Sequence, residues 1–145
     1  MATRNYTPIF SEIIEDFERA PTRKEKIEVL REYDNPRFRE FLEMTFNPNI
    51  QFDVKVPPYK ESFDPAGLAV LTIAGEIPRL YRFVKDHPKN AANLSEQKKE
   101  NLLAAVLESL EKREAKLLVG MIEKKLDVKY LTPLLIKEAY TGINL

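Results

Sequence analysis

The chain has 145 residues, of which 23 are basic and 23 acidic, and its formal net charge is zero. This length suits one domain with a substantial core, and the balanced charge argues against a dedicated nucleic-acid binder, which is usually basic. The sequence contains no cysteine, which excludes disulfides, thiol catalysis and cysteine metal sites. It has no apolar run long enough to cross a bilayer and no apolar signal core near its start, so we expect a cytoplasmic protein that does not enter membranes.

The first third of the chain predicts three amphipathic helices. Apolar side chains recur at helical spacing in residues 9–19, with an acidic face opposite them. A second helix begins after Thr22, a predicted N-cap, and Glu25 is spaced to complete a capping box. The third opens with Pro36, where a missing N–H costs nothing. It ends just before Pro48, because the residue preceding a proline avoids helical geometry.

Residues 49–57, "NIQFDVKVP", carry apolar side chains at every second position and are followed by a further proline. Such alternation predicts an extended segment with one buried face. We find no convincing partner strand and therefore expect a single extended segment that lies across the helices. Residues 68–73, "LAVLTI", fit a strand and fit equally a helix that opens at Asp64-Pro65, so the state of residues 64–75 stays open.

The second half predicts further helices. In "GEIPRLYRFVKDHP" we expect a helix with Pro78 in its first turn that ends before Pro88. Ser95 is a predicted N-cap for a strongly patterned helix that extends to Leu110.

Residues 111–126 follow almost directly and are apolar around most of their circumference, so we expect them to form a central helix. Gly120 inside that helix costs roughly 1 kcal/mol relative to alanine, and we attribute it to close contact with another helix. Thr132 caps the last helix and Gly142 terminates it. Together these elements predict an all-α, single compact domain over residues 1–145, with six or seven helices.

The sequence contains few residues that could carry catalytic chemistry. His87 is the single histidine, which makes a metal site or a nucleophile–base pair unfavourable. Neither a G-x-G-x-x-G nor a P-loop motif is present. The carboxylates of Glu12 and Asp16 share one helix face, where solvation explains them. We therefore expect no enzyme, no cofactor and no metal.

Two clusters of basic residues are candidates for binding. Arg23, Lys24 and Lys26 occupy the first turn of a helix, and free N–H groups together with such side chains favour phosphate. The second cluster, which lies around the turn before the last helix, consists of Lys124, Lys125 and Lys129, with Thr132 nearby. A solvated charged face is the alternative explanation for both clusters.

The run "PTRKEKIEVLREYDNPRFREFLEMTFNPNIQFDVKVPPY" resembles the N-terminal DNA-binding domain of ATP-dependent DNA ligases, particularly those of tailed bacteriophages. The later stretches "REAKLLVGMIEKKL" and "TPLLIKEAYTGI" are similar to the end of that domain. The resemblance spans residues 16–60 and 95–143 and rests on the order and spacing of the motifs. The chain also resembles small phage-encoded proteins of unknown function.

The resemblance implies an all-α domain that holds duplex DNA across the minor groove through phosphate contacts. The chain departs from it at Asp127-Val128-Lys129, where ligases carry a Cys/Ile-Gly pair, and no Lys-x-Asp-Gly adenylation motif is present, so we expect no ligation. The residues that this resemblance and the basic clusters nominate for DNA contact are Thr22, Arg23, Lys24, Lys124, Lys125, Lys129, Thr132 and Lys137.

Two functional hypotheses stay open at this point. The first is a non-catalytic, phage-encoded module that binds duplex DNA without sequence preference and acts in the host cytoplasm. The second is a protein–protein adaptor, structural or inhibitory protein that keeps the fold without binding DNA and whose partner is a replication, host or virion protein. DNA is favoured if Arg23, Lys24, Lys125, Lys129 and Lys137 share one concave surface without acids. The adaptor is favoured if Glu123, Asp127 and Glu138 lie among them.

Overall fold

The computed structural model describes residues 7–63 and 69–145, in which seven α-helices and no β-strand are found. In chain order the helices are α1 (Phe10–Arg19), α2 (Arg23–Glu32), α3 (Pro36–Phe46), α4 (Ile73–Leu80), α5 (Glu96–Ser109), α6 (Lys112–Glu123) and α7 (Pro133–Ala139). They enclose one hydrophobic core, which confirms the prediction of an all-α compact domain with six or seven helices.

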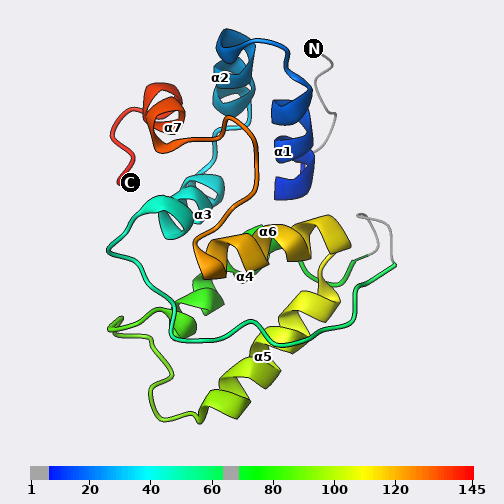
Figure 1. The fold of residues 1–145 in the computed structure, drawn as a ribbon, viewed down its shortest axis with the longest axis vertical. Helices are drawn as coiled ribbons and strands as arrows, with labels where there is room; N and C mark the ends of the chain where they lie inside the picture. Colours follow the sequence, from blue (N-terminus) through cyan, green and yellow to red (C-terminus); the bar gives the residue numbers. More distant parts are fainter. Residues whose placement is uncertain (1–6, 64–68) are drawn as a thin grey trace.

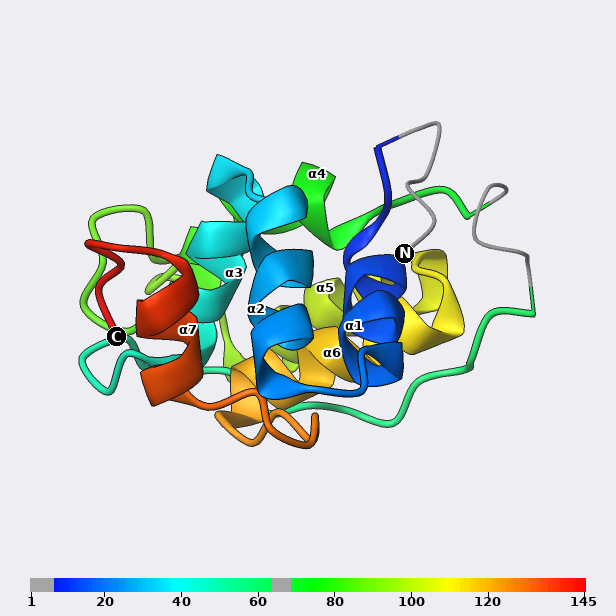
Figure 2. The same ribbon diagram turned by 90° about the horizontal axis from the view of Figure 1, so that it is seen from above.

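Helix α6 lies across the middle of the molecule, with α1, α2 and α3 on one side and α5 on the other (Figure 1). It packs against α1, α3 and α5. Leu118 and Met121 on α6 are fully buried. The prediction that this helix is central is therefore confirmed. Figure 2, seen from above, shows α7, α2 and α1 as neighbours over α3 and α6.

A cluster of three phenylalanine rings joins α1 to α3. The ring centroid of Phe10 lies 5.1 Å from that of Phe38 and 5.2 Å from that of Phe41. All three side chains are buried, and tilted or edge-on aromatic pairs at such distances add attraction beyond their buried area. The apolar spacing read from the sequence thus produces the packing expected of it.

The predicted N-caps Thr22, Ser95 and Thr132 are in place, and Asn35 caps α3 in the same way. A side-chain oxygen of each cap accepts a hydrogen bond from the backbone N–H three residues later, which satisfies one of the otherwise free donors of a helix start. The donor–acceptor distances are 3.1 Å for Thr22, 2.8 Å for Asn35, 3.2 Å for Ser95 and 3.3 Å for Thr132.

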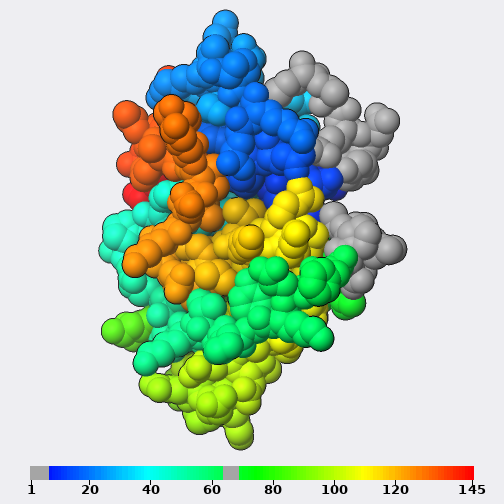
Figure 3. Space-filling view, turned by 45° about the vertical axis from the view of Figure 1, so that its right-hand side comes forward, coloured from blue at the N-terminus to red at the C-terminus, as the bar shows by residue number. Residues whose placement is uncertain are grey.

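The segment that follows α3 is extended, as predicted, and its alternate apolar side chains (Ile50, Phe52, Val54 and Val56) are half-buried against the core. Figure 3 shows it in green, lying on the molecular surface between α6 and α5. It does find one partner. Phe52 forms an antiparallel bridge with Val84, in which the Asp53 N–H donates to the Phe83 carbonyl at 2.8 Å. The sequence pattern did not reveal this short contact.

Helix α4 begins earlier than predicted and ends sooner. Its N-cap is Thr72, whose hydroxyl accepts the Gly75 N–H at 3.1 Å. Pro78 therefore lies in the interior of the helix, and its predicted place in the first turn was wrong. The helix ends at Leu80 and passes into a single 3₁₀ turn over Tyr81–Phe83, so it does not continue to Pro88.

Part of the undecided stretch 64–75 is now defined. Leu71 forms a parallel bridge with Leu110, and its N–H donates to the Ser109 carbonyl at 3.0 Å. The chain before α4 is thus extended, and residues 73–75 are helical. Residues 64–68, where the alternative helix start at Asp64-Pro65 falls, lie outside the described residues.

Gly120 makes room for the returning chain rather than for another helix, so the predicted reason for this glycine was wrong. A Cβ atom at Gly120 would lie 3.0 Å from Leu126 Cδ1 and 3.1 Å from Leu126 Cα. The chain folds back here because Lys124 adopts a left-handed conformation, with φ 58°, at the end of α6.

None of the helices in the described parts of the chain is long and apolar enough to reach across a bilayer.

Candidate functional site

Helices α2 and α7 lie side by side, and polar contacts fix their arrangement. The hydroxyl of the buried Tyr140 donates to the Leu30 carbonyl at 2.5 Å, and burial raises the pKa of Tyr140 above its ordinary value. Arg31 donates to the Glu138 carbonyl at 3.0 Å. Arg23 forms an ion pair with the Glu138 carboxylate. Arg23, from the first basic cluster, thus meets α7 directly.

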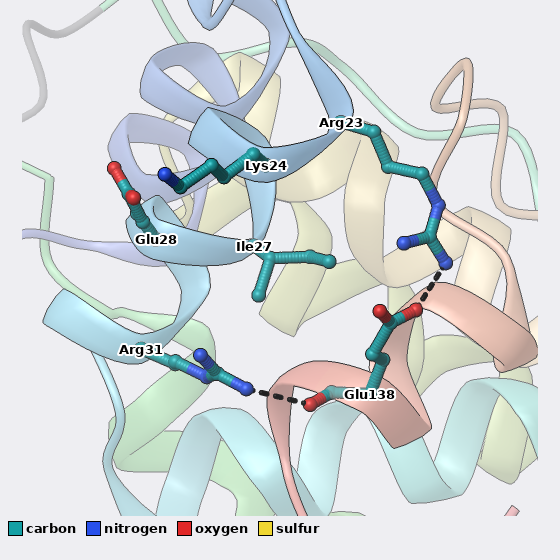
Figure 4. A pocket seen from close by; sticks show the side chains of 6 residues that line it. All are labelled: Arg23, Lys24, Ile27, Glu28, Arg31 and Glu138. Atoms are coloured by element: carbon teal, nitrogen blue, oxygen red, sulfur yellow. Dashed lines mark hydrogen bonds and ion pairs between the residues drawn. The ribbon is translucent and has the colours of Figure 1, made fainter.

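A pocket of about 420 Å³ lies between these helices, and Figure 4 shows its lining. We call it the Glu138 pocket. Its lining residues are Arg23, Lys24, Ile27, Glu28, Arg31 and Glu138. Both arginines are held by α7, and the hydrogen bond between Arg23 and Glu138 raises the pKa of the arginine and lowers that of the carboxyl. Cations and carboxylates therefore alternate in this pocket.

A second pocket, of about 370 Å³, lies at the start of α2 and α7. We call it the Tyr130 pocket. Its lining residues are Pro21, Arg23, Lys26, Tyr130, Thr132, Leu134 and Leu135. They include two cations, three large apolar or aromatic side chains and no carboxylate. This composition differs sharply from that of the Glu138 pocket.

Two large side chains of the Tyr130 pocket face solvent. Leu134 is 73% exposed and Tyr130 is 59% exposed. Leu134 lies out of phase with the buried residues of α7, which are Leu135, Ile136 and Ala139. Tyr130 has a left-handed backbone, with φ 70°, which is unusual for a bulky residue.

Lys26 contributes a buried positive charge to the Tyr130 pocket. The residue is 7% exposed, and its Nζ donates to the carbonyls of Phe17 at 2.9 Å and Glu18 at 3.4 Å. These carbonyls belong to the last turn of α1, which carries partial negative charge. Nζ also lies 5.6 Å from the centre of the Tyr130 ring. The ammonium of Lys129 approaches the same ring to 5.1 Å, so two cations flank Tyr130.

The residues nominated from the sequence are only partly brought together. Arg23 and Lys24 line the Glu138 pocket, and Thr132 lines the Tyr130 pocket with Arg23. The hydroxyls of Thr22 and Thr132 serve as N-caps.

Lys124 lies apart from both pockets, at the end of α3. Its Nζ donates to the carbonyls of Met44 at 2.5 Å and Asn47 at 2.9 Å, and burial lowers its pKa to about 8. The ammonium of Lys124 is thus bound by backbone carbonyls of the fold itself.

The remaining nominated lysines are exposed. Lys125 and Lys129 lie in the connection between α6 and α7, and Lys137 lies on the outer face of α7. Within residues 7–63 and 69–145, none of the three forms an ion pair.

The sequence interpretation missed Tyr130 and Leu134. One signal was available for Leu134, because an apolar residue out of phase with the buried stripe of its own helix is expected to face outward. For Tyr130 the sequence contains no such signal, because glycine and asparagine, and not tyrosine, are the residues that commonly adopt a left-handed backbone.

A buried polar cluster at the start of α6 serves the fold. Glu114 accepts the N–H of Ser11 at 3.1 Å and that of Ile73 at 3.0 Å. Burial raises the pKa of Glu114, and these two N–H groups oppose the rise. Burial alone would also raise the pKa of Glu111, but hydrogen bonds from Arg113 and backbone N–H groups outweigh it and the net shift is downward. Both carboxylates thus cap helix starts.

In the part of the chain that the structure describes, no group of three or more histidine, aspartate or glutamate side chains is placed to hold a metal ion.

A protein-family profile, described as a family of unknown function (DUF6433), matches residues 13–128. The chain belongs to the DUF6433 family. The matched range takes in most of α1 and all of α2 to α6, and it ends before Tyr130 and α7. No curated protein matches the chain, and no solved structure does. Because the function of the family is unknown, membership carries no activity, and the resemblance to ligase domains stays a prediction.

Proposed function

We propose that the chain is a non-catalytic protein-binding module that docks a partner protein on the Tyr130 pocket. The observation that carries this proposal is the exposure of Tyr130 and Leu134, two large side chains that line one concave site. Exposed apolar groups gathered at a polar-rimmed hollow are typical of protein–protein contact sites. Tyrosine is also among the residues that dominate binding energy at such sites.

The backbone of Tyr130 supports the same proposal. A left-handed conformation costs a bulky residue on the order of 1–3 kcal/mol, and such strain is concentrated at functional sites. The turn is held by a hydrogen bond from the Leu131 N–H to the Val128 carbonyl at 3.2 Å. The fold thus maintains an exposed aromatic ring in a conformation that a glycine or an asparagine would adopt with less strain.

The arrangement of charge favours a protein partner over duplex DNA. A phosphate-binding surface needs cations that are free to replace counterions. Here Arg23 is paired with Glu138, and Lys124 is occupied by two backbone carbonyls. Glu28 and Glu138 lie among the cations of the Glu138 pocket, and Glu138 is one of the three acids whose presence there favours the adaptor hypothesis.

Site-specific photo-crosslinking in the cells that naturally express the chain tests this proposal. A photoreactive amino acid replaces Leu134 in one variant and Val70 in the control, because Val70 is a comparably exposed apolar residue at 81%. We expect a protein that crosslinks to position 134 and not to position 70. The purified partner should then bind the unmodified chain and lose at least about tenfold in affinity when Leu134→Ser is introduced.

A parallel titration tests the DNA hypothesis. A labelled random-sequence duplex is titrated with the chain at low and at moderate salt. Micromolar binding that weakens steeply with salt and disappears with Lys125→Glu and Lys129→Glu would replace the adaptor proposal by the DNA hypothesis. Equal crosslinking from positions 134 and 70 would also contradict docking at the Tyr130 pocket.

A further inference from the structure

We infer that the segment bound in the Tyr130 pocket is acidic and apolar: it carries a carboxylate that pairs with Lys26, next to an apolar side chain that packs on Leu134. This inference rests on the proposed function and specifies the kind of partner that the site accepts.

Two buried lysines of this protein differ in their partners. Lys26 and Lys99 are each 7% exposed. The Nζ of Lys99 lies 3.0 Å from the carboxylate of Asp53, as expected of a buried charge. Lys26 has two backbone carbonyls and the faces of the Phe17 and Tyr130 rings for partners and, among the described residues, no carboxylate. An ammonium has three donors, and two are used here. Because both acceptors are neutral carbonyls, the charge of Lys26 lacks a counterion within residues 7–63 and 69–145.

The charged side chains that line the Tyr130 pocket are positive. Arg23 and Lys26 line it, and the ammonium of Lys129 lies over the ring of Tyr130. Arg23 pairs with the Glu138 carboxylate from the neighbouring pocket, whereas Lys26 and Lys129 form no ion pair within the described residues. An excess of positive charge in a hollow of low polarity attracts an anion and raises its rate of association.

The apolar wall of the Tyr130 pocket selects among anions. Pro21, Tyr130 and Leu134 supply much of the lining. A bare phosphate would leave this wall against water, whereas a peptide places an apolar side chain within a few ångströms of a carboxylate. The volume of about 370 Å³ falls in the range of pockets that bind small molecules. The combination therefore fits a glutamate or an aspartate close to an apolar anchor.

Selection of peptides from a displayed random library tests the inference. The full chain is the target, and the Leu134→Ser variant is used to remove peptides that bind elsewhere. We expect the surviving peptides to carry a carboxylate within about one helical turn of an apolar residue. Their affinities are then measured by fluorescence anisotropy with synthetic labelled peptides.

A double-mutant cycle assigns the carboxylate to Lys26. Lys26→Met keeps most of the aliphatic stem and removes the charge. In the peptide, the glutamate is replaced by glutamine. Each single change should weaken binding by at least about tenfold, while the Gln peptide should bind Lys26→Met no worse than it binds the unmodified chain. Equal losses from Glu→Gln on both proteins would overturn the assignment.

A second variant guards against a folding defect, because Lys26 also contacts the last turn of α1. Lys129 is exposed, so Lys129→Glu should leave the helical content intact, as measured by circular dichroism. It should still lower the affinity for the acidic peptide several-fold. Lys98→Glu on α5, another exposed lysine, is the matched control and should leave the affinity unchanged.

The outcomes separate the inference from the proposed function. Neutral or basic peptides that require Leu134 would overturn the acidic partner and leave docking at the Tyr130 pocket supported. Failure to recover any Leu134-dependent peptide, together with no crosslink at position 134, would overturn both. Displacement of a bound peptide by duplex DNA at micromolar concentration would assign the cations of this pocket to phosphate and overturn the inference as well.

Discussion

The hydroxyl of Tyr140 donates a hydrogen bond to the carbonyl of Leu30, and both residues are fully buried. This bond ties the end of α7 to the end of α2. Helix α7 has seven residues, too few to be stable alone in water, so its helical state depends on such contacts with α2. The Tyr130 pocket, which both helices line, depends on them too.

Tyr140→Phe should lower the free energy of unfolding by about 1–3 kcal/mol, because the Leu30 carbonyl loses its donor inside the core while the ring stays. Urea denaturation of the variant and the unmodified chain measures the difference. Tyr130→Phe removes a hydroxyl from an exposed ring and is the control, for which we expect a change within about 0.5 kcal/mol. Equal effects of the two changes would contradict a structural role for the Tyr140 bond.

Lys124→Met should destabilise the fold by about 1–2 kcal/mol at neutral pH, because the carbonyls at the end of α3 lose a charged donor. Lys125→Met is the matched control, since Lys125 is exposed and its side chain forms no ion pair within the described residues. Thermal unfolding of both variants gives the comparison. If Lys125→Met lowered the stability as much as Lys124→Met does, the stabilising role of the two carbonyl contacts would be contradicted.

The titration of the Lys124 ammonium should be visible in the pH dependence of stability. Burial lowers the pKa of Lys124 from 10.5 to about 8. Between these pH values the unfolded chain holds a proton that the folded chain has released. The free energy of unfolding of the unmodified chain, relative to that of Lys124→Met, should therefore rise with pH through this window.

Chemical denaturation of both proteins across that pH range measures the trend. A relative stability that falls instead would show that the carbonyl contacts hold the proton more strongly than burial expels it.

Gly120→Ala should lower the stability by about 1–3 kcal/mol, although alanine normally stabilises a helix interior. The added Cβ would lie 3.0 Å from Leu126 Cδ1 and 3.1 Å from Leu126 Cα. Leu126→Ala removes the first contact but not the second, so the double variant should stay less stable than Leu126→Ala alone. A higher melting temperature for Gly120→Ala would contradict this account of the glycine.

Local sequence signals were sufficient to predict where most of the helices lie. Apolar spacing, together with the capping residues Thr22, Ser95 and Thr132, located helix starts correctly because a cap acts within one turn. Helix α4 was misplaced because its start depends on Leu71, which is held by Leu110 from a distant part of the chain. Periodicity within a short window contains no information on such a pairing.

The candidate site was less predictable than the fold. Lys26 was grouped with exposed basic residues, and its burial follows from the packing of α1 on α2, which places the Phe17 carbonyl at its ammonium. Likewise, the pairing of Arg23 with Glu138 brings together residues from opposite ends of the chain. The count of charged residues shows that the whole chain is neutral. Tertiary packing decides which of the charges remain without a partner.

The carboxylate of Glu114 links helix starts that are remote in sequence. From the first turn of α6 it binds the N–H of Ser11 in α1 and the N–H of Ile73 in α4. Because one side chain holds both amides, opening either helix start releases part of the same buried contact. The two amide protons should therefore exchange with deuterium through a shared opening, with similar protection and a similar dependence on denaturant. In this protein, fraying at one helix start would then be coupled to loosening at another.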